Sequence, residues 1–153
     1  MNREKRFALV RILFGFVWAV DAGLKWVPEI RLHIVDVLAQ TQVGQPALEY
    51  AWIQLWVNIA GMHPLFFGTG IALVETALAL SLITGVFSRA ALYCGVVFSF
   101  LVWSVPQGFG GPYGPGSTDI DSGSIYLFVF VLLILGSAWQ RYNLQPLLWK
   151  KTY

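Results

Sequence analysis

The sequence predicts an all-α integral membrane protein, a four-helix bundle with two short amphipathic helices between the first and second spans. Three observations lead to this fold class. Of the 153 residues, 57% are hydrophobic and 12% are charged, against about 45–50% and about 25% in an average soluble domain. Four apolar windows approach the length of a membrane span, and the basic residues are distributed unevenly around them. The length fits a single transmembrane domain over residues 1–153.

The four predicted spans cover about residues 7–26, 65–84, 90–105 and 124–139. A hydrocarbon core about 30 Å thick needs about 20 mostly apolar residues per helix. The third and fourth windows are somewhat short and reach this length once flanking residues are counted. A cleaved signal peptide is the alternative interpretation of the first window. Because the apolar run continues past Ala22 to Trp26, we expect a retained helix instead.

The basic residues predict how the bundle is oriented. Eight of the ten lysines and arginines precede or open the first span, lie between the second and third spans, or follow the fourth. The other two, Lys25 and Arg31, fall on the opposite side. Since basic residues are enriched on the cytoplasmic side of membranes, both termini are expected in the cytoplasm. The net charge of +2 is not gathered into a stripe that could bind nucleic acid.

Residues 28–64 are too polar to cross a membrane, yet their apolar residues recur with the period of a helix. One apolar stripe consists of Ile30, Ile34, Val37 and Leu38. After a break at residues 43–46, a second stripe consists of Leu48, Trp52, Leu55, Trp56 and Ile59. The pattern predicts two short amphipathic helices at the membrane interface, where the two indole rings can be buried while their N–H groups stay hydrated.

The second outer segment, residues 106–123, reads PQGFGGPYGPGSTDIDSG. Its glycines and prolines favour a shaped loop over a regular helix or strand. Unpaired backbone cannot face lipid, so the loop is expected to meet water or to fold over the mouth of the bundle, capped by Phe109 and Tyr113. Asp119 and Asp121 precede the fourth span and are candidates for capping its free N–H groups. The pattern departs from a calcium-binding loop after its first two aspartates.

Glu75 stands near the middle of the second span. A charge at the bilayer centre costs about 2.5–3.5 kcal/mol even on the lenient insertion scale, so this side chain is expected to face the bundle interior. Two interpretations stay open: proton transfer or hydrogen bonding to a quinone, and a polar clamp between helices. Asp21 and Lys25 are four residues apart in the first span and can form an ion pair. Contact with an anionic substrate is the alternative.

Other residue types exclude several kinds of site. The single cysteine, Cys94, excludes an internal disulfide and any multi-cysteine zinc or iron–sulfur site within this chain. His33 and His63 lack the spacing of metal ligands. No pattern typical of a haem, flavin or metal site is evident.

Aromatic residues make up 16% of the chain and offer stacking surfaces for a flat head group. The best-placed candidates are Trp18, Trp103, Phe109 and Tyr113. Rings in such positions more often serve as interfacial anchors or pack between helices, and the sequence leaves both interpretations open.

Three groups of residues are informative in combination. The first span contains Arg11-Ile-Leu-Phe-Gly15 and Gly23-Leu-Lys25. The second contains Glu75, followed by Leu82-Ile-Thr-Gly85-Val-Phe-Ser-Arg89-Ala-Ala. The outer loop contains Gly108-Phe-Gly-Gly-Pro-Tyr-Gly-Pro-Gly-Ser-Thr-Asp-Ile-Asp121. Together these groups resemble the DoxX/DoxD family of small four-helix membrane proteins over most of the chain. The glycine-rich loop that ends in Thr-Asp-Ile is similar to the DoxD branch.

The resemblance implies a membrane subunit of a thiosulfate:quinone oxidoreductase in a prokaryotic plasma membrane. In that reaction thiosulfate is oxidised to tetrathionate and a membrane quinone accepts the electrons. Other members of the family are associated with sulfurtransferase and oxidative-stress partners. Besides the lipid bilayer, we therefore expect a second protein subunit as partner, and a homo-oligomer is compatible with the sequence. Electrons would pass directly from substrate to quinone or through that second subunit.

The predicted site has three sets of residues. The catalytic set, which handles protons, is Glu75 and Asp119. The substrate-binding set, beneath the glycine-rich loop, is Lys25, Arg31, Asp21 and Asp121. The quinone-binding set is Trp18, Trp103, Phe109 and Tyr113. Two other classes of function stay open: a noncatalytic membrane scaffold that docks a redox partner through the outer loops, and a transporter of a small solute.

Overall fold

The computed structural model describes residues 2–113 and 120–144, and over these ranges the chain is helical and contains no strand. In chain order the α-helices are α1 (Arg3–Lys25), α2 (Pro28–Leu32), α3 (Ile34–Thr41), α4 (Ala47–Met62), α5 (Pro64–Thr84), α6 (Ser88–Ser104) and α7 (Ser122–Leu135). The 3-10 turns η1 (Gly108–Gly110) and η2 (Ala138–Gln140) follow α6 and α7. The predicted all-α class is confirmed.

Four apolar helices, α1, α5, α6 and α7, lie within a few residues of the four predicted windows. Of the described helices, α1 and α5, with 23 and 21 residues, are long and apolar enough to cross a membrane. Helices α6 and α7 have 17 and 14 residues. At 1.5 Å per residue α7 is roughly 21 Å long, which is less than the hydrocarbon core of about 30 Å.

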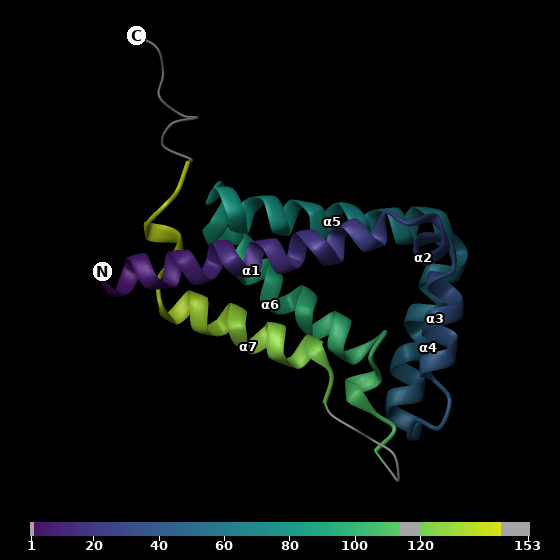
Figure 1. Ribbon diagram of the computed structural model, residues 1–153. Coiled ribbons are helices and arrows are strands. Elements are labelled where there is room, and N and C mark those ends of the chain that lie inside the picture. The colour runs from purple at the N-terminus through teal and green to yellow at the C-terminus, as the bar shows by residue number, and fades with distance from the viewer. Residues whose placement is uncertain (1, 114–119, 145–153) are drawn as a thin grey trace.

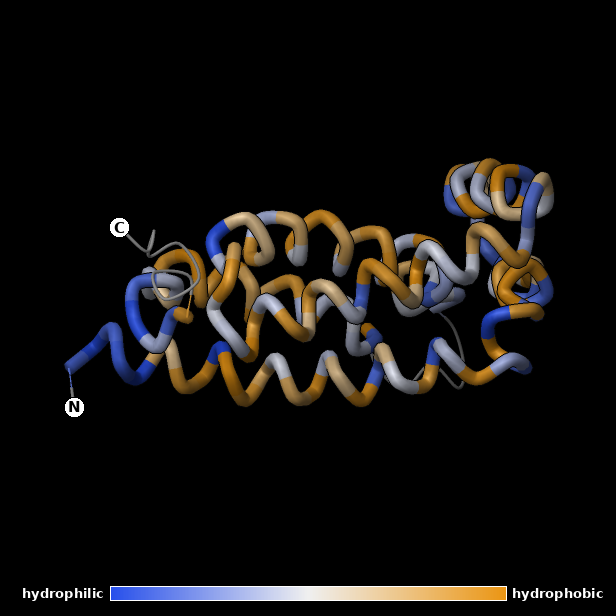
Figure 2. Tube along the Cα trace, turned by 90° about the horizontal axis from the view of Figure 1, so that it is seen from above, coloured by the Kyte–Doolittle hydropathy of each residue, from blue (hydrophilic) through white to orange (hydrophobic). Residues whose placement is uncertain are grey.

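The four apolar helices form a bundle of two pairs (Figure 1). Helix α1 packs along α5, and α6 packs along α7. Helices α5 and α6 are joined by a short turn at residues 85–87 and diverge from there, so that they enclose a wedge. Hydrophobic segments run along the bundle, and much of the hydrophilic chain gathers towards its two ends (Figure 2).

The core of the bundle is aromatic. Phe14 and Trp18 of α1 contact Phe130 of α7 with ring centroids 5.0 and 5.6 Å apart. Phe98 of α6 and Tyr126 of α7 complete this cluster around Trp18, which is 2% exposed. Edge-to-face and tilted ring contacts of this kind stabilise a core beyond the burial of apolar area. The cluster ties α1 to the α6–α7 pair.

One end of the bundle, called here the inner end, holds both the start of α1 and the chain after α7. The Arg141 guanidinium pairs with Glu4 at 2.9 Å. The buried Arg11 side chain donates four hydrogen bonds to backbone carbonyls. Their acceptors are Leu82 of α5, Ala138 of η2, and Arg141 and Tyr142 beyond it. Because carbonyl oxygens accept readily from a guanidinium, this one residue joins three parts of the chain.

The opposite end, called the outer end, carries helices α2, α3 and α4, which together form an outer layer across the wedge (Figure 1). Thr41 Oγ1 donates to the Pro106 carbonyl at 3.0 Å, and Trp52 Nε1 donates to Ser104 Oγ at 3.2 Å. Segments 28–64 and 106–113 therefore lie at the same end of the molecule.

The outer layer differs from its prediction in two respects. It contains three helices instead of two, because the chain turns at His33 as well as at residues 42–46. Helix α2 ends where the Arg31 carbonyl packs against Gly68 of α5, so closely that a Cβ at Gly68 would lie 2.3 Å from that oxygen. The second difference concerns the apolar stripe predicted on α4, which is divided. Trp52 and Trp56 pack against the buried cluster of Leu38, Ala60 and Val105, whereas Leu48 is 80% exposed.

Candidate functional site

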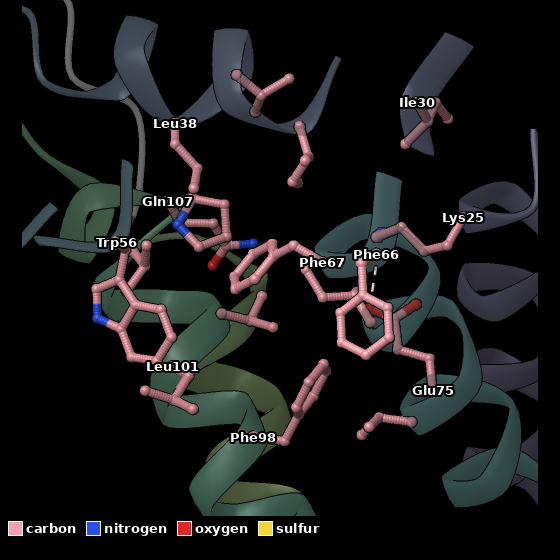
Figure 3. A pocket seen from close by; sticks show the side chains of 18 residues that line it. Lys25, Ile30, Leu38, Trp56, Phe66, Phe67, Glu75, Phe98, Leu101 and Gln107 are labelled. Atoms are coloured by element: carbon pink, nitrogen blue, oxygen red, sulfur yellow. Dashed lines mark ion pairs between the residues drawn. The ribbon is translucent and has the colours of Figure 1, made fainter. Parts of the chain in front are cut away.

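A cavity of about 530 Å³ lies in the wedge between α5 and α6, beneath the outer layer (Figure 3). Its lining side chains are almost all apolar or aromatic. They are Ile30, Ile34, Val37 and Leu38 from α2 and α3, Trp56 from α4, Phe66, Phe67, Gly70, Ile71, Val74 and Glu75 from α5, Phe98, Leu101 and Val102 from α6, with Lys25, Val105, Pro106 and Gln107. The volume is within the range of about 300–1,000 Å³ that is usual for small-molecule sites.

Helix α5 forms one wall with two rows of residues. Because residues four apart lie one above the other on a helix, Phe67, Ile71 and Glu75 make one row and Phe66, Gly70 and Val74 make the next. Glu75 is 3% exposed, whereas Phe66 and Val74 are 82% and 43% exposed. The first row therefore ends deep in the cavity and the second row borders its opening.

The cavity wall contains an ion pair formed by Lys25 and Glu75, which the sequence predicted as a substrate-binding and a catalytic residue. Lys25 Nζ lies 3.8 Å from Glu75 Oε1, and the two side chains are 32% and 4% exposed. Among the described residues, no group donates a hydrogen bond to Glu75 Oε2. A buried carboxylate with one unsatisfied oxygen is costly. The arrangement leaves both an ammonium donor and a carboxyl oxygen for a ligand in the cavity.

The predicted inward orientation of Glu75 is confirmed, but the partner predicted for Lys25 is different. The sequence suggested a pair between Asp21 and Lys25 on one helix face, whereas the structure pairs Lys25 with Glu75 on a neighbouring helix. Lys25 is the last residue of α1, so its long side chain can turn towards α5. Asp21 remains close enough to interact electrostatically with Glu75 and with Tyr126 of α7.

Arg31 lies outside the cavity lining. Its guanidinium carbon is 5.6 Å from the centre of the Trp26 ring, and its aliphatic part approaches Gly68. The Trp26 indole in turn donates to Thr76 Oγ1 at 3.1 Å. Stacking of this kind positions a guanidinium without an acidic partner. The structure thus does not bring Arg31 and Lys25 together in the cavity.

The four predicted quinone-binding aromatics are also outside the cavity lining. Trp18 belongs to the aromatic core, where it packs on Phe98, one of the lining residues. Trp103 contacts Phe109 with ring centroids 5.2 Å apart and donates from Nε1 to the Ile120 carbonyl at 2.8 Å. The Tyr113 hydroxyl donates to the Phe109 carbonyl. These three residues contact one another or the backbone of the chain that follows α6.

The structure describes one of the two predicted aspartates, Asp121, which lies directly before α7. Asp121 occupies the N-cap position of α7, although its side chain makes no capping hydrogen bond to the described part of that helix. Its carbonyl accepts from Ser124 Oγ at 2.7 Å. Gln107 instead holds this helix start, through Ser122 Oγ at 3.0 Å and the Gly123 amide at 2.9 Å. Asp119 lies outside the described residues.

Sequence reasoning missed most of the residues that form the cavity. Phe66, Phe67 and Phe98 read as ordinary apolar positions in spans, and Gly70 as a small residue in a helix. The available signal was the spacing of Phe66, Gly70 and Val74, which places a glycine between two large residues on one face. Arg11 served in the sequence analysis for orientation and for the family resemblance. Its buried role has no signature in the sequence beyond its position inside the apolar window.

Comparisons with family models, with curated proteins and with solved structures give no match for this chain.

Proposed function

We propose that this chain crosses the membrane four times and binds a quinone in the α5–α6 cavity as the membrane subunit of a redox complex. The observation that carries the proposal is the ion pair of Lys25 with the buried Glu75, in the wall of a cavity whose other lining residues are, apart from Gln107, apolar. Such a site suits a lipid-soluble molecule that has polar oxygen atoms at one end. A quinone ring has two carbonyl oxygens that accept hydrogen bonds, and it binds protons when it is reduced.

The membrane part of the proposal is supported by the outward faces of the four bundle helices. Leu13 and Val20 of α1 are each 66% exposed, Val97 of α6 is 61% exposed, and Phe128 and Leu135 of α7 are 63% and 65% exposed. Apolar surface of this extent is rare in contact with water and is expected in contact with lipid. The shorter helices α6 and α7 are accommodated by flanking residues and local thinning of the bilayer.

The proposed chemistry divides between the two polar residues. Lys25 donates a hydrogen bond to one quinone carbonyl and stabilises the negative charge that reduction places on that oxygen. A quinone takes up two protons with two electrons to become a quinol. Glu75 takes a proton from water, which ends its ion pair with Lys25, and passes that proton to one quinone oxygen. The second proton comes from water, and Glu75 pairs with Lys25 again until the next turnover. We infer from the resemblance to DoxD-like proteins that the electrons come from two thiosulfate ions, which join through a new S–S bond to give tetrathionate.

A second protein subunit is part of the proposal. The outer layer carries Glu29, Asp36 and Glu49, and negative charge there repels a thiosulfate dianion at long range. A partner with a basic surface would dock on this layer and bring the sulfur substrate or its electrons. A noncatalytic scaffold is the second candidate. It is favoured because Arg31 stacks on Trp26 outside the cavity, so that Lys25 is the single basic side chain among the described residues that line it. One basic side chain is a weak site for a sulfur dianion.

The test uses membranes that contain the full-length chain and measures thiosulfate-dependent quinone reduction. Lys25→Ala and Glu75→Gln should each lower the rate about tenfold or more, the effect of losing a hydrogen bond to a charged group. Lys5→Ala and Glu4→Gln, at the inner end and outside the cavity lining, are the matched controls and should have little effect. Activity that survives both cavity substitutions would remove the proposed site. A co-purifying polypeptide that carries the activity and stays active beside a chain with both cavity substitutions would favour the scaffold.

A further inference from the structure

The residues around the cavity opening are apolar, and this affects how a ligand can reach the cavity. Four of the lining side chains are large, apolar and well exposed: Phe66 is 82% exposed, Val37 and Val74 are each 43% exposed, and Ile30 is 38% exposed. An opening to water would be costly with such a border. The deep part of the same cavity holds the Glu75 carboxylate, whose side chain is 4% exposed, and Lys25, 32% exposed, pairs with it from nearer the surface. The buried polar group therefore lies further in than the apolar border.

Gly70 makes a gap in this border. It is the middle residue of the row Phe66, Gly70 and Val74, whose other two members are large and exposed. A Cβ built at Gly70 meets no atom within 4 Å, so the space beside it is open. By contrast, a Cβ at Gly68, on the face of α5 that packs against α2, would lie 2.3 Å from a backbone oxygen. The glycine at position 70 is thus not required by helix packing.

We propose that the gap at Gly70 is a lateral passage, through which a quinone with an isoprenoid tail enters the cavity from the bilayer and along which its tail lies once the ring is bound. This inference rests on the proposed function and adds the class of quinone and its route. The ring occupies the deep end beside Lys25 and Glu75, and the tail leaves between Phe66 and Val74. The cavity behind this gap is lined by residues of both α5 and α6 (Figure 3).

The row spacing fits this arrangement. Glu75 and Gly70 are five residues apart on α5, which corresponds to about 7.5 Å along the helix axis at 1.5 Å per residue. At 3.6 residues per turn the two positions are also about 140° apart around α5. A tail attached to a ring at Glu75 therefore curves around the helix to the gap, within the cavity that both residues line. Phe67 and Ile71, in the deeper row, lie along that path and offer apolar contact.

The test is photolabelling in phosphatidylcholine vesicles that contain the full-length chain. The probe is a quinone with a photoreactive group at the end of an isoprenoid tail, and the labelled peptide is identified by mass spectrometry. The passage predicts labelling of residues 66–74 on α5. Gly70→Leu should lower this labelling about tenfold or more. Gly61→Leu is the matched control, because Gly61 in α4 also has nothing within 4 Å and lies outside the cavity lining.

The outcomes separate this inference from the proposed function. If labelling depends on Lys25 and Glu75 but falls on the outer layer or on α7, or persists in Gly70→Leu, the passage is refuted and the quinone site stands. If labelling is unaffected by Lys25→Ala and Glu75→Gln, the quinone site itself is refuted. Should Gly70→Leu fail to fold, the position of the label in the wild-type chain and in Gly70→Ala decides the question in the same way.

Discussion

Arg11 offers the sharpest test of how the bundle is held together. The substitution Arg11→Met replaces a fully buried guanidinium by an apolar side chain of similar length and removes four hydrogen bonds to backbone carbonyls. The bonds to Leu82 and Ala138 are buried, at 2.9 and 3.0 Å. A hydrogen bond to a charged group contributes about 1.5–3 kcal/mol. The two buried bonds alone therefore predict a loss of about 3–6 kcal/mol in the free energy of unfolding.

That loss is large beside the total stability of a domain, which is about 5–15 kcal/mol. For a chain of this size each kcal/mol shifts the melting temperature by about 2–4 °C, which gives a decrease of roughly 6–24 °C. The assay is thermal unfolding of the purified full-length chain in one detergent, followed by circular dichroism. Arg6→Met, at an exposed position of the same helix, is the control. Equal melting temperatures for the two variants would refute the structural role assigned to Arg11.

Two further predictions concern packing and the outer end. Gly95→Val should lower the free energy of unfolding by about 1–3 kcal/mol, because a Cβ at this position would lie 2.2 Å from the buried Phe130 ring. Gly61→Val, where a Cβ meets nothing within 4 Å, is the control. Equal stability of the two variants in chemical denaturation would contradict the packing. Gln107→Leu should make the start of α7 more accessible to protease, because the variant loses the hydrogen bonds to Ser122 and Gly123, worth about 0.5–1.5 kcal/mol each. Cleavage at the wild-type rate would contradict this anchoring role.

The bundle could be predicted from the sequence because its signals are local. Apolar windows locate α1, α5, α6 and α7, since a run of apolar residues has the same meaning wherever the rest of the chain lies. The inward orientation of Glu75 could be predicted because a charge on the lipid-facing side of an apolar helix is costly. That prediction did not depend on which residue pairs with Glu75. The turn at Gly85, where φ is +80°, likewise follows from a glycine between two apolar runs.

The site could not be predicted to the same extent, because it depends on contacts between helices. The pairing of Lys25 with Glu75 joins residues that are far apart in the sequence. The i, i+4 rule compares only neighbours on the same helix, and on α1 it pairs Lys25 with Asp21. Trp18 was assigned to a ligand because its position on α1 suited one, yet four other rings enclose it. The turn at His33 depends on the close approach of α2 to Gly68 of α5. Helix periodicity carries no information on such a contact.

The position of the outer layer across the wedge has a mechanical consequence. Helix α4 continues into α5 through His63, and Trp52 of α4 is hydrogen-bonded to Ser104 at the end of α6. The outer layer therefore acts as a spacer that sets the distance between the outer ends of α5 and α6. A protein that binds this layer and tilts α4 changes the cavity volume without touching the ligand. By thermodynamic linkage, a ligand in the cavity must alter the affinity of that protein by the same factor.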